Sequence, residues 1–402
     1  DIQVVSLLTR PGRSGQTISN IIEGCSKNKF NYLIIWVSTS NISMKRLKEN
    51  SPKKHILIVG AGIIGKFNAL ELSRLGYQVT VADPNQNENC SNAALGILMG
   101  NIYQKRSGRS WMLRERSIEL WPKWIKYLKE FNTELNIEKP LIQLTTNEEK
   151  FEKLKRFASK NASQNLSILE EDSKLIKNIS EIFKTKNING IISYEDGRVN
   201  PISLLKTLDI SLKKEKVTFL KDEIINIKKF NRQWISTSQR NNEIKSDGII
   251  LCNSLKAVDL IDKKYDLKLK PVLGQAIELY IDEQQIDFLS LPKHFSINGT
   301  NIIPINKNKI IIGSTDEFNT NPEKYAFERL TDFLDKKPDW LHKEKITNKW
   351  FGIRSQPVGE PSPIMRNIEK GLLLCTGFYK NGFLLAPACS NWASNILREE
   401  IH

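Results

Sequence analysis

Residues 54–83 constrain the fold of this 402-residue chain more than any other stretch. Residues 56–59 form a short apolar run, which predicts a buried parallel strand, and residues 78–82 form a second strand-like run. Between them lie a glycine-rich turn and apolar residues at helical spacing, which end at Gly76, where a helix C-cap belongs. The order strand, turn, helix, strand predicts an α/β fold with a Rossmann-like parallel sheet.

The glycine-rich turn has the spacing G-x-G-x-x-G, and each of its glycines has a physical role. Gly60 allows a tight turn, Gly62 lets the backbone approach a pyrophosphate, and Gly65 lets the helix pack closely on the strand. Asp83 follows at roughly the 20-residue spacing expected of a carboxylate that binds a ribose hydroxyl. We therefore predict a dinucleotide site. The alternative is a glycine-rich turn between a strand and a helix in another α/β fold.

Composition excludes several classes of function. The chain has no apolar run of 18 or more residues, so no membrane span is predicted. Its net charge of +15 comes from scattered lysines, which favours a compositional background over a nucleic-acid site. The five cysteines are widely spaced and no histidine lies inside a motif, so we predict no metal site, no disulfide framework and no Ser/His or Cys/His nucleophile. A reducing cytoplasm fits this cysteine usage best.

The beginning of the chain fits none of these patterns. Residues 1–50 predict an N-terminal extension of uncertain structure, with one strand at residues 31–38. Residues 44–54 read as a lead-in to the first predicted strand. We hypothesise that residues 1–43 are a loosely attached extension outside the functional protein.

The middle of the chain predicts alternating helices and strands. Residues 110–130 predict an amphipathic helical stretch of one or two helices, with a kink or restart at Pro122 and with tryptophans in the core. Further on we predict a strand at 142–146, polar helices at 147–160 and 167–179, a strand, turn and helix at 190–208, and strands at 217–227, 233–237 and 247–253.

The last third predicts a new sheet and a second glycine turn. A strand at 269–280 and two antiparallel strands within 301–317 build the sheet, and residues 350–365 are rich in turns. A buried strand at 371–376 then leads through a glycine-containing turn at 377–382 into a helix from Leu384 to the end. This turn repeats the logic of the first, because a helix N-terminus again points at a ligand.

Small residues follow the first unit in the run Ser91 to Gly96. Small side chains let the backbone come close to a flat ligand, and Ser and Asn add hydrogen bonds. The run could equally serve as a contact between helices.

Together these pieces resemble the FAD-dependent D-amino-acid oxidase superfamily, and within it glycine oxidase of thiamine biosynthesis. The resemblance runs from about residue 54 to the C-terminus. It is carried by HILIVGAGIIG with Asp83, SNAALGILMG, EDGRVNPISLL, PVLGQ, IIGSTDE, FGIRSQPVGEPSPI and CTGFYKNGFLLAP.

The resemblance implies a Rossmann-like FAD-binding domain intergrown with an antiparallel-sheet substrate domain. Its expected bounds are 51–110, 190–255 and 350–402 for the FAD-binding domain, and 111–189 and 256–349 for the substrate domain. The residues implied to bind FAD are Gly60, Ala61, Gly62, Ile63, Ile64, Gly65, Asp83, Pro84, Ser91, Asn92, Ala93, Ala94, Gly96, Ile97, Ile224, Asn253, Gly377, Phe378, Tyr379, Asn381, Gly382, Phe383 and Leu384.

Two side chains are implied to be catalytic. Arg354 would pair with the substrate carboxylate; the alternative is a structural ion pair at a loop. Lys380 stands where the family usually has arginine, and it keeps the charge without the bidentate fork; the alternative is a solvated surface lysine. The sequence also departs from the family at residues 253–254, where Asn-Ser replaces the usual Ala-Gly.

The implied activity is oxidation of the amine of glycine or a small D-amino acid, with hydride transfer to flavin N5, feeding thiazole synthesis for thiamine. One alternative is a flavin dehydrogenase that passes electrons to a non-oxygen acceptor, and another is a tRNA-modifying oxidase. The expected partner is a small amino-acid substrate, with a homo-oligomer possible and nucleic acid not expected.

Overall fold

The computed structural model describes residues 53–401 apart from 85–89, 163–164, 282–285, 287 and 335. The chain divides into two compact units, Asp1–Pro52 and Lys53–His402, and every described residue belongs to the second. The predictions for residues 1–50, including the strand at 31–38, lie outside the described residues.

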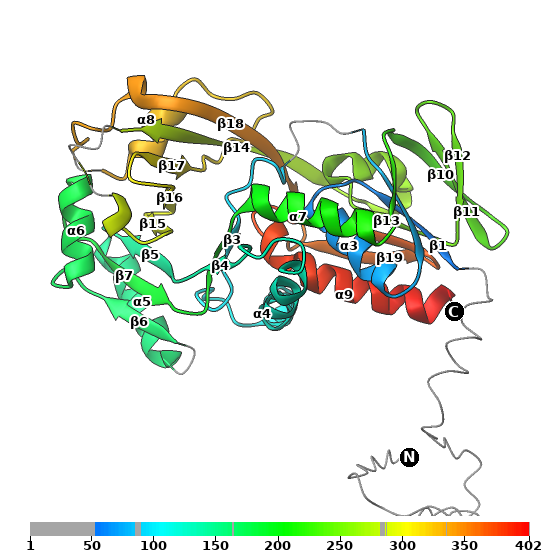
Figure 1. The fold of residues 1–402 in the computed structure, drawn as a ribbon, viewed down its shortest axis with the longest axis horizontal. Helices are drawn as coiled ribbons and strands as arrows, with labels where there is room; N and C mark the ends of the chain where they lie inside the picture. The colour runs from blue at the N-terminus through cyan, green and yellow to red at the C-terminus, as the bar shows by residue number, and fades with distance from the viewer. Residues whose placement is uncertain are drawn as a thin grey trace, which may run out of the picture. The chain divides into compact units, whose positions relative to one another are not determined.

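One part of this unit is built around a six-stranded sheet, whose strands come from both ends of the described chain (Figure 1). Its strands run parallel except for the edge strand β19, which is antiparallel to its neighbour. The predicted run at 78–82 is a strand with those bounds. In spatial order the strands are β19 (Ile364–Glu369), β20 (Leu372–Thr376), β13 (Gly248–Leu251), β1 (His55–Val59), β2 (Gln78–Ala82) and β9 (Thr218–Leu220).

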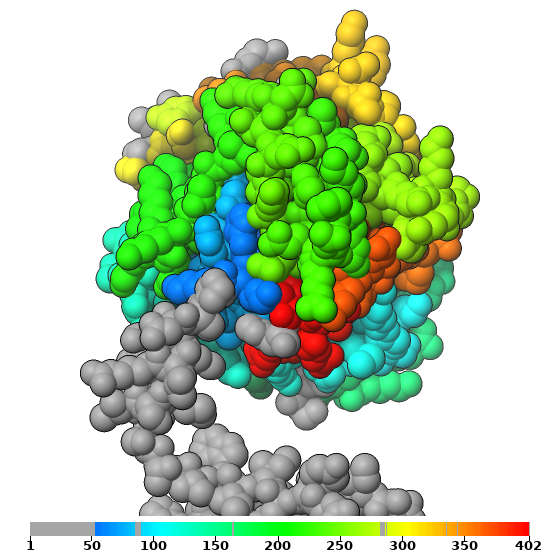
Figure 2. Space-filling view, turned by 90° about the vertical axis from the view of Figure 1, so that its right-hand side faces the viewer, coloured from blue at the N-terminus to red at the C-terminus, as the bar shows by residue number. Residues whose placement is uncertain are grey.

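Both faces of this sheet are covered, because alternate residues of a strand point to opposite sides. Ile56 and Ile58 of β1 pack into a core shared with the helices α3 (Ile63–Arg74) and α9 (Gly382–Ile401). Leu57 packs on the other side, in a core shared with the three-stranded antiparallel sheet. Figure 2 shows the side where this small sheet, in green, stands near the red C-terminal helix. Its strands are β10 (Ile224–Phe230), β11 (Gln233–Ser238) and β12 (Glu243–Ser246).

Helix α4 (Gly108–Leu128) packs on the helical side of the same sheet. Trp121 and Trp124 are buried, and both meet the ring of Phe67 edge to face, at 5.6 and 5.1 Å between centroids. The prediction that the tryptophans of this stretch belong to the core is confirmed for these two. Trp111 is only half-buried, with the Arg106 guanidinium 4.7 Å from its ring centroid. The predicted restart at Pro122 is wrong, because one helix runs through it. Tertiary contacts, including the Trp121 indole bond to the Leu384 carbonyl at 3.0 Å, compensate for the missing proline N–H.

A second, eight-stranded sheet is antiparallel except where β15 meets β5 (Figure 1). Its main core includes side chains of α6 (Lys174–Phe183) and α8 (Ala326–Thr331). With parallel and antiparallel sheets in one mixed α/β unit, the predicted fold class is confirmed. The spatial order is β18 (Ile346–Pro357), β14 (Leu269–Tyr280), β17 (Lys309–Gly313), β16 (Thr300–Pro304), β15 (Phe295–Ile297), β5 (Leu141–Thr145), β7 (Asn189–Ser193) and β6 (Leu166–Leu169).

Two predictions for segments of the eight-stranded sheet are wrong. The predicted helix at 167–179 starts as the edge strand β6, which pairs with β7; α6 begins only after Ser173, whose hydroxyl accepts the Ile176 N–H. The segment predicted as turns at 350–365 is, up to Pro357, the second half of β18. Long-range pairing with β14 holds it extended, which a local pattern does not reveal.

A third, small sheet of short strands belongs to the same unit. Arg198 lies in it, donating from Nε to the Leu95 carbonyl at 2.8 Å and pairing with Glu138 at 2.6 Å. The remaining elements are β3 (Ile97–Leu98), β8 (Gly197–Val199), β4 (Ile137–Glu138), α5 (Glu148–Lys160), α7 (Pro201–Lys214), and the 3-10 helices η2 (Ser254–Leu260), η3 (Lys263–Tyr265), η4 (Phe288–Ser290) and η5 (Lys343–Lys345).

Within the described part of the chain, no helix combines the length and the apolar character needed to cross a membrane.

Candidate functional site

The first glycine turn joins β1 to α3 at the carboxyl end of the parallel strands. Gly60 has φ +102°, and a Cβ there would lie 2.8 Å from the Cys252 carbonyl oxygen. A Cβ on Gly65 would lie 1.9 Å from the Gly60 carbonyl oxygen, so the helix can approach the strand this closely only with glycine. Gly62 is the N-cap residue of α3. The turn is therefore a compact cradle made of backbone.

Asp83 closes this cradle from the end of β2. Its Oδ2 accepts the Ala61 N–H at 2.7 Å, and its own N–H donates to the Leu220 carbonyl at 3.0 Å. Pro84 follows Asp83 directly, just beyond the end of β2. The carboxylate is thus fixed at the same sheet edge as the turn, where the motif predicts it.

The small-residue run lies against the same turn. Ser91 accepts the Ile63 N–H on its hydroxyl at 2.9 Å, and the Ala93 carbonyl accepts the indole N–H of Trp350 at 3.2 Å. Trp350 belongs to β18, so this run connects the start of α3 with the eight-stranded sheet. Asn92 and Ala94 lie in the run, and Ile97 begins β3 just after Gly96.

The second turn joins β20 to α9. Tyr379 donates its N–H to the Ser355 carbonyl at 3.1 Å, and the Asn381 side chain accepts from Arg114 at 2.7 Å. Arg114 is buried on α4, and burial lowers its pKa, with partial compensation from Tyr103 and Asp196. Sequence reasoning missed Arg114, because its role depends on packing between α4 and α9.

The two turns lie next to each other. Helices α3 and α9 pack together, and a Cβ on Gly382 would lie 3.6 Å from Cγ2 of Ile63. Two helix N-termini, more than 300 residues apart in the chain, therefore meet at one place. Helix N-termini carry unpaired N–H groups and partial positive charge, so this edge suits an anionic ligand.

Some predicted residues offer this edge only their backbone. The side chains of Ile64, Phe383 and Leu384 are buried in the helical core, and Phe378 is buried there too. Ile224, at the start of β10, packs in the core on the opposite side of the parallel sheet. Gly377 precedes Phe378 at the end of β20.

Asn253 supplies an unsatisfied group at the sheet edge. It follows β13 beside Gly60, and its buried Oδ1 has no hydrogen-bond partner among the described residues. A buried amide oxygen without a partner is costly in a folded protein. A polar ligand bound at this edge would satisfy it.

The two predicted catalytic cations converge from separate elements. Arg354 lies on β18 with its side chain 11% exposed, and Lys380 lies in the second turn with its side chain 49% exposed. Both pair with one carboxylate, that of Asp316: Arg354 at 2.8 Å to Oδ1 and Lys380 at 2.5 Å to Oδ2. The guanidinium lies close over Gly274, where a Cβ would meet Nη2 at 2.0 Å.

Sequence reasoning missed Asp316 and the contacts of Arg354 around it. The guanidinium also donates to the Thr315 carbonyl at 3.2 Å and to the Ser314 hydroxyl at 2.5 Å. Ser314, Thr315 and Asp316 belong to the motif IIGSTDE, which contributes to the family resemblance but predicts no function for these residues. Burial, and then the negative charge of Asp316, raise the pKa of Tyr379, whose hydroxyl lies 3.5 Å from Asp316.

Three thiols lie near the two turns: those of Cys375 and Cys389 are buried, and Cys252 is half-buried. Burial raises the pKa of each, so they stay protonated near neutral pH. A protonated buried thiol is a poor nucleophile. These cysteines act as packing around the two turns.

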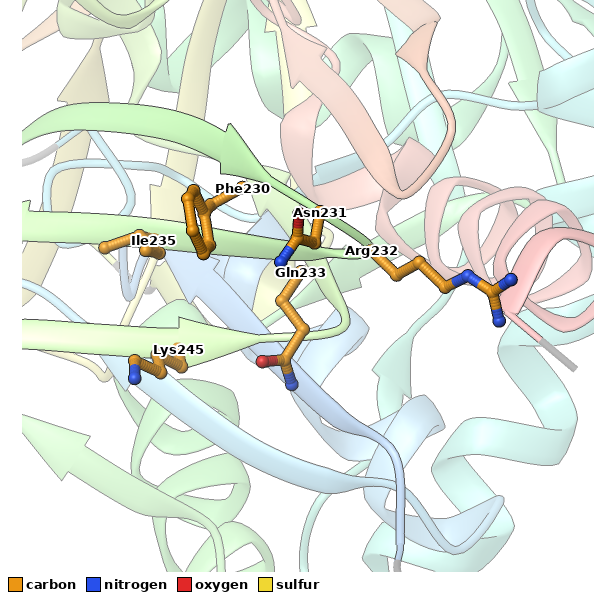
Figure 3. A pocket seen from close by; sticks show the side chains of 6 residues that line it. All are labelled: Phe230, Asn231, Arg232, Gln233, Ile235 and Lys245. Carbon is orange, nitrogen blue, oxygen red and sulfur yellow. The ribbon is translucent and has the colours of Figure 1, made fainter.

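A surface hollow of about 430 Å³ lies elsewhere, on the small three-stranded sheet (Figure 3). It surrounds the turn between β10 and β11, and no predicted site residue lines it. Its lining residues are Phe230, Asn231, Arg232, Gln233, Ile235 and Lys245.

The family model described as FAD dependent oxidoreductase matches residues 55–396, which is most of the chain. The chain belongs to this family of FAD-dependent oxidoreductases. The match spans both glycine turns, both sheets and the Arg354 strand.

Two relatives match most of this oxidoreductase at low sequence identity. It is 24% identical over 361 residues to the bifunctional protein ThiO/ThiG of Nostoc sp., covering 86% of the chain and 53% of that protein. It is 25% identical over 358 residues to glycine oxidase of Pseudomonas aeruginosa, covering 86% and 94%. The chain thus spans about half the length of the bifunctional relative.

Solved structures show the same fold. The structure of glycine oxidase from Bacillus cereus superposes with a TM-score of 0.71 at 20% sequence identity, over 86% of this chain and 95% of that one.

The residues present fit FAD. The backbone cradle at Gly60 suits a pyrophosphate, and Asp83 suits a ribose. The Asn253 Oδ1, which has no partner among the described residues, can accept a hydrogen bond from the ligand. Ser91 and the second helix N-terminus complete the edge. In this oxidoreductase we expect FAD to be held by these groups, with its pyrophosphate at the start of α3.

Proposed function

We propose that this FAD-dependent oxidoreductase oxidises the amine of glycine or a small D-amino acid. The observation that carries the proposal is the convergence of Arg354 and Lys380 beside the second turn. One carboxylate reaches both cations at once, as Asp316 shows, so a small amino acid could be held there by its own carboxylate.

The chain's residues have separate tasks in this proposal. FAD, when bound, supplies the hydride acceptor. Arg354 and Lys380 bind the substrate carboxylate and orient its α-carbon. The N-terminus of α9 places partial positive charge beside the second turn, where it favours negative charge. No histidine is required, because hydride transfer from a neutral amine needs no side chain as nucleophile.

The resemblance of the motif set to glycine oxidase of thiamine biosynthesis supports a place in thiazole synthesis. We propose that role, a cytoplasmic location and a small amino acid as partner. The domain bounds stay proposals too; α4, assigned by sequence to the substrate domain, packs on α3 and α9 instead.

The test is reduction of the bound flavin without air. We expect glycine or D-alanine to bleach the flavin absorbance, with L-alanine as the matched control that does not. If no small amino acid reduces the flavin, the proposal is wrong. Admitting oxygen then distinguishes an oxidase, which releases hydrogen peroxide, from a dehydrogenase that uses another acceptor.

A further inference from the structure

We propose that Asp316 sets the affinity of this site for carboxylate substrates, because it occupies the carboxylate position between Arg354 and Lys380 and competes with substrates for it. This inference rests on the proposed function, because it assigns that position to the substrate. It predicts that the enzyme binds small monocarboxylates weakly, and that removing the charge of Asp316 strengthens their binding.

The contacts of Asp316 match those that a substrate carboxylate would make. One oxygen pairs with Arg354 at 2.8 Å and the other with Lys380 at 2.5 Å. Both cations are therefore already neutralised in part by a carboxylate of the same chain. With Asp316 the three side chains sum to one positive charge, and without it to two.

The backbone around Asp316 is fixed on both sides. Thr315 donates its N–H to the Gln275 carbonyl at 3.0 Å and accepts the Gln275 N–H on its hydroxyl at 2.8 Å. Glu317 exchanges backbone hydrogen bonds with Leu273 at 2.8 and 2.9 Å, and it is 1% exposed. The Asp316 carboxylate is thus tethered beside the cations, which gives it a high effective concentration there.

A substrate carboxylate can take this position when the Asp316 side chain moves aside. That side chain is 35% exposed, against 11% for Arg354, so its carboxylate can rotate toward water while the guanidinium stays in place over Gly274. An entering carboxylate replaces one charged partner with another, and the net gain is small. Displacing Asp316 costs the same for every monocarboxylate, and glycine has no side chain whose contacts could offset that cost.

The test is acetate binding to the FAD-loaded enzyme, measured by calorimetry and by the change in flavin absorbance. Acetate carries the carboxylate without the amine, so no turnover is involved. We expect Asp316→Asn to bind acetate about tenfold more tightly than the unaltered enzyme, since a charged hydrogen bond no longer has to be displaced. In turnover, KM for glycine should fall by a similar factor while kcat changes by less than about twofold.

The matched control is Asp266→Asn, which removes the same charge from an exposed turn where the side chain is 74% exposed. It should leave acetate affinity unchanged. In an Arg354→Ala background the effect of Asp316→Asn should shrink, because Asp316 then competes for Lys380 alone.

Unchanged or weaker acetate binding in Asp316→Asn would overturn the inference. If that variant fails to retain FAD, Asp316→Ser gives the same test, because serine is uncharged and too short to contact both cations. The outcome is separate from the proposed function: failure of every amino acid to reduce the flavin rejects the substrate, whereas the acetate titration still reports on Asp316.

Discussion

Two regions of the molecule are built in different ways: the sheet edge that we propose holds FAD, called the cofactor edge, and the cation pair of Arg354 and Lys380. The cofactor edge is made of backbone: two glycine turns, two helix N-termini and the carboxyl ends of parallel strands. The cation pair is made of long side chains from a strand and a turn, joined by Asp316. A backbone site tolerates few substitutions at its glycines, whereas a side-chain site can be retuned by one charge.

This difference separates the effects of mutation. Changes at the cofactor edge should alter FAD retention before they alter substrate affinity. Changes at the cation pair should alter substrate affinity while FAD stays bound. The following variants test that separation.

The largest effect is expected for Gly65→Ala. The new Cβ would lie 1.9 Å from the Gly60 carbonyl oxygen, so the turn must deform, at a cost of about 3 kcal/mol or more. We expect FAD affinity to fall by more than about 100-fold, measured as flavin retained after gel filtration. Gly76→Ala is the control: its Cβ meets nothing within 4 Å, so it should lose some stability through its positive φ but keep FAD. Retention of FAD by Gly65→Ala would argue against the cradle.

The next effect is expected for Arg354→Ala. This variant should keep FAD and raise KM for the amino-acid substrate about 50-fold, because it removes a charge-assisted contact to the carboxylate. Steady-state kinetics with flavin content measured in parallel provide the test. An unchanged KM would remove Arg354 from the substrate site.

A smaller effect is expected for Gly274→Ala. The methyl group would meet Arg354 Nη2 at 2.0 Å and push the guanidinium aside without removing its charge. We expect KM to rise about tenfold, with kcat less affected and FAD retained. A loss of FAD together with activity would instead show that the two regions are mechanically coupled.

The smallest effect is expected for Lys380→Ala. Its side chain is half exposed, so solvent screens its charge, and KM should rise only about threefold. Lys380→Arg, which adds the bidentate fork, should bind substrate at least as well as the unaltered enzyme. If Lys380→Ala matched Arg354→Ala in its effect, the two cations would contribute equally and this ranking would be wrong.

The sequence by itself determined the strand–turn–helix units on either side of the cofactor edge. The G-x-G-x-x-G turn, the strand at 78–82 and Asp83 follow from local spacing, because each glycine's task depends on neighbours in the same strand–turn–helix unit. The final strand and helix were predicted for the same reason, although α9 begins two residues earlier than expected, at Gly382.

Tertiary structure decided the rest. The extended conformation of β18 depends on pairing with β14, and the edge strand β6 on pairing with β7. Asp316 meets Arg354 and Lys380 across separations of 38 and 64 residues. Such contacts depend on strand register and on which side chains face one another across it, and a local hydrophobic pattern carries neither.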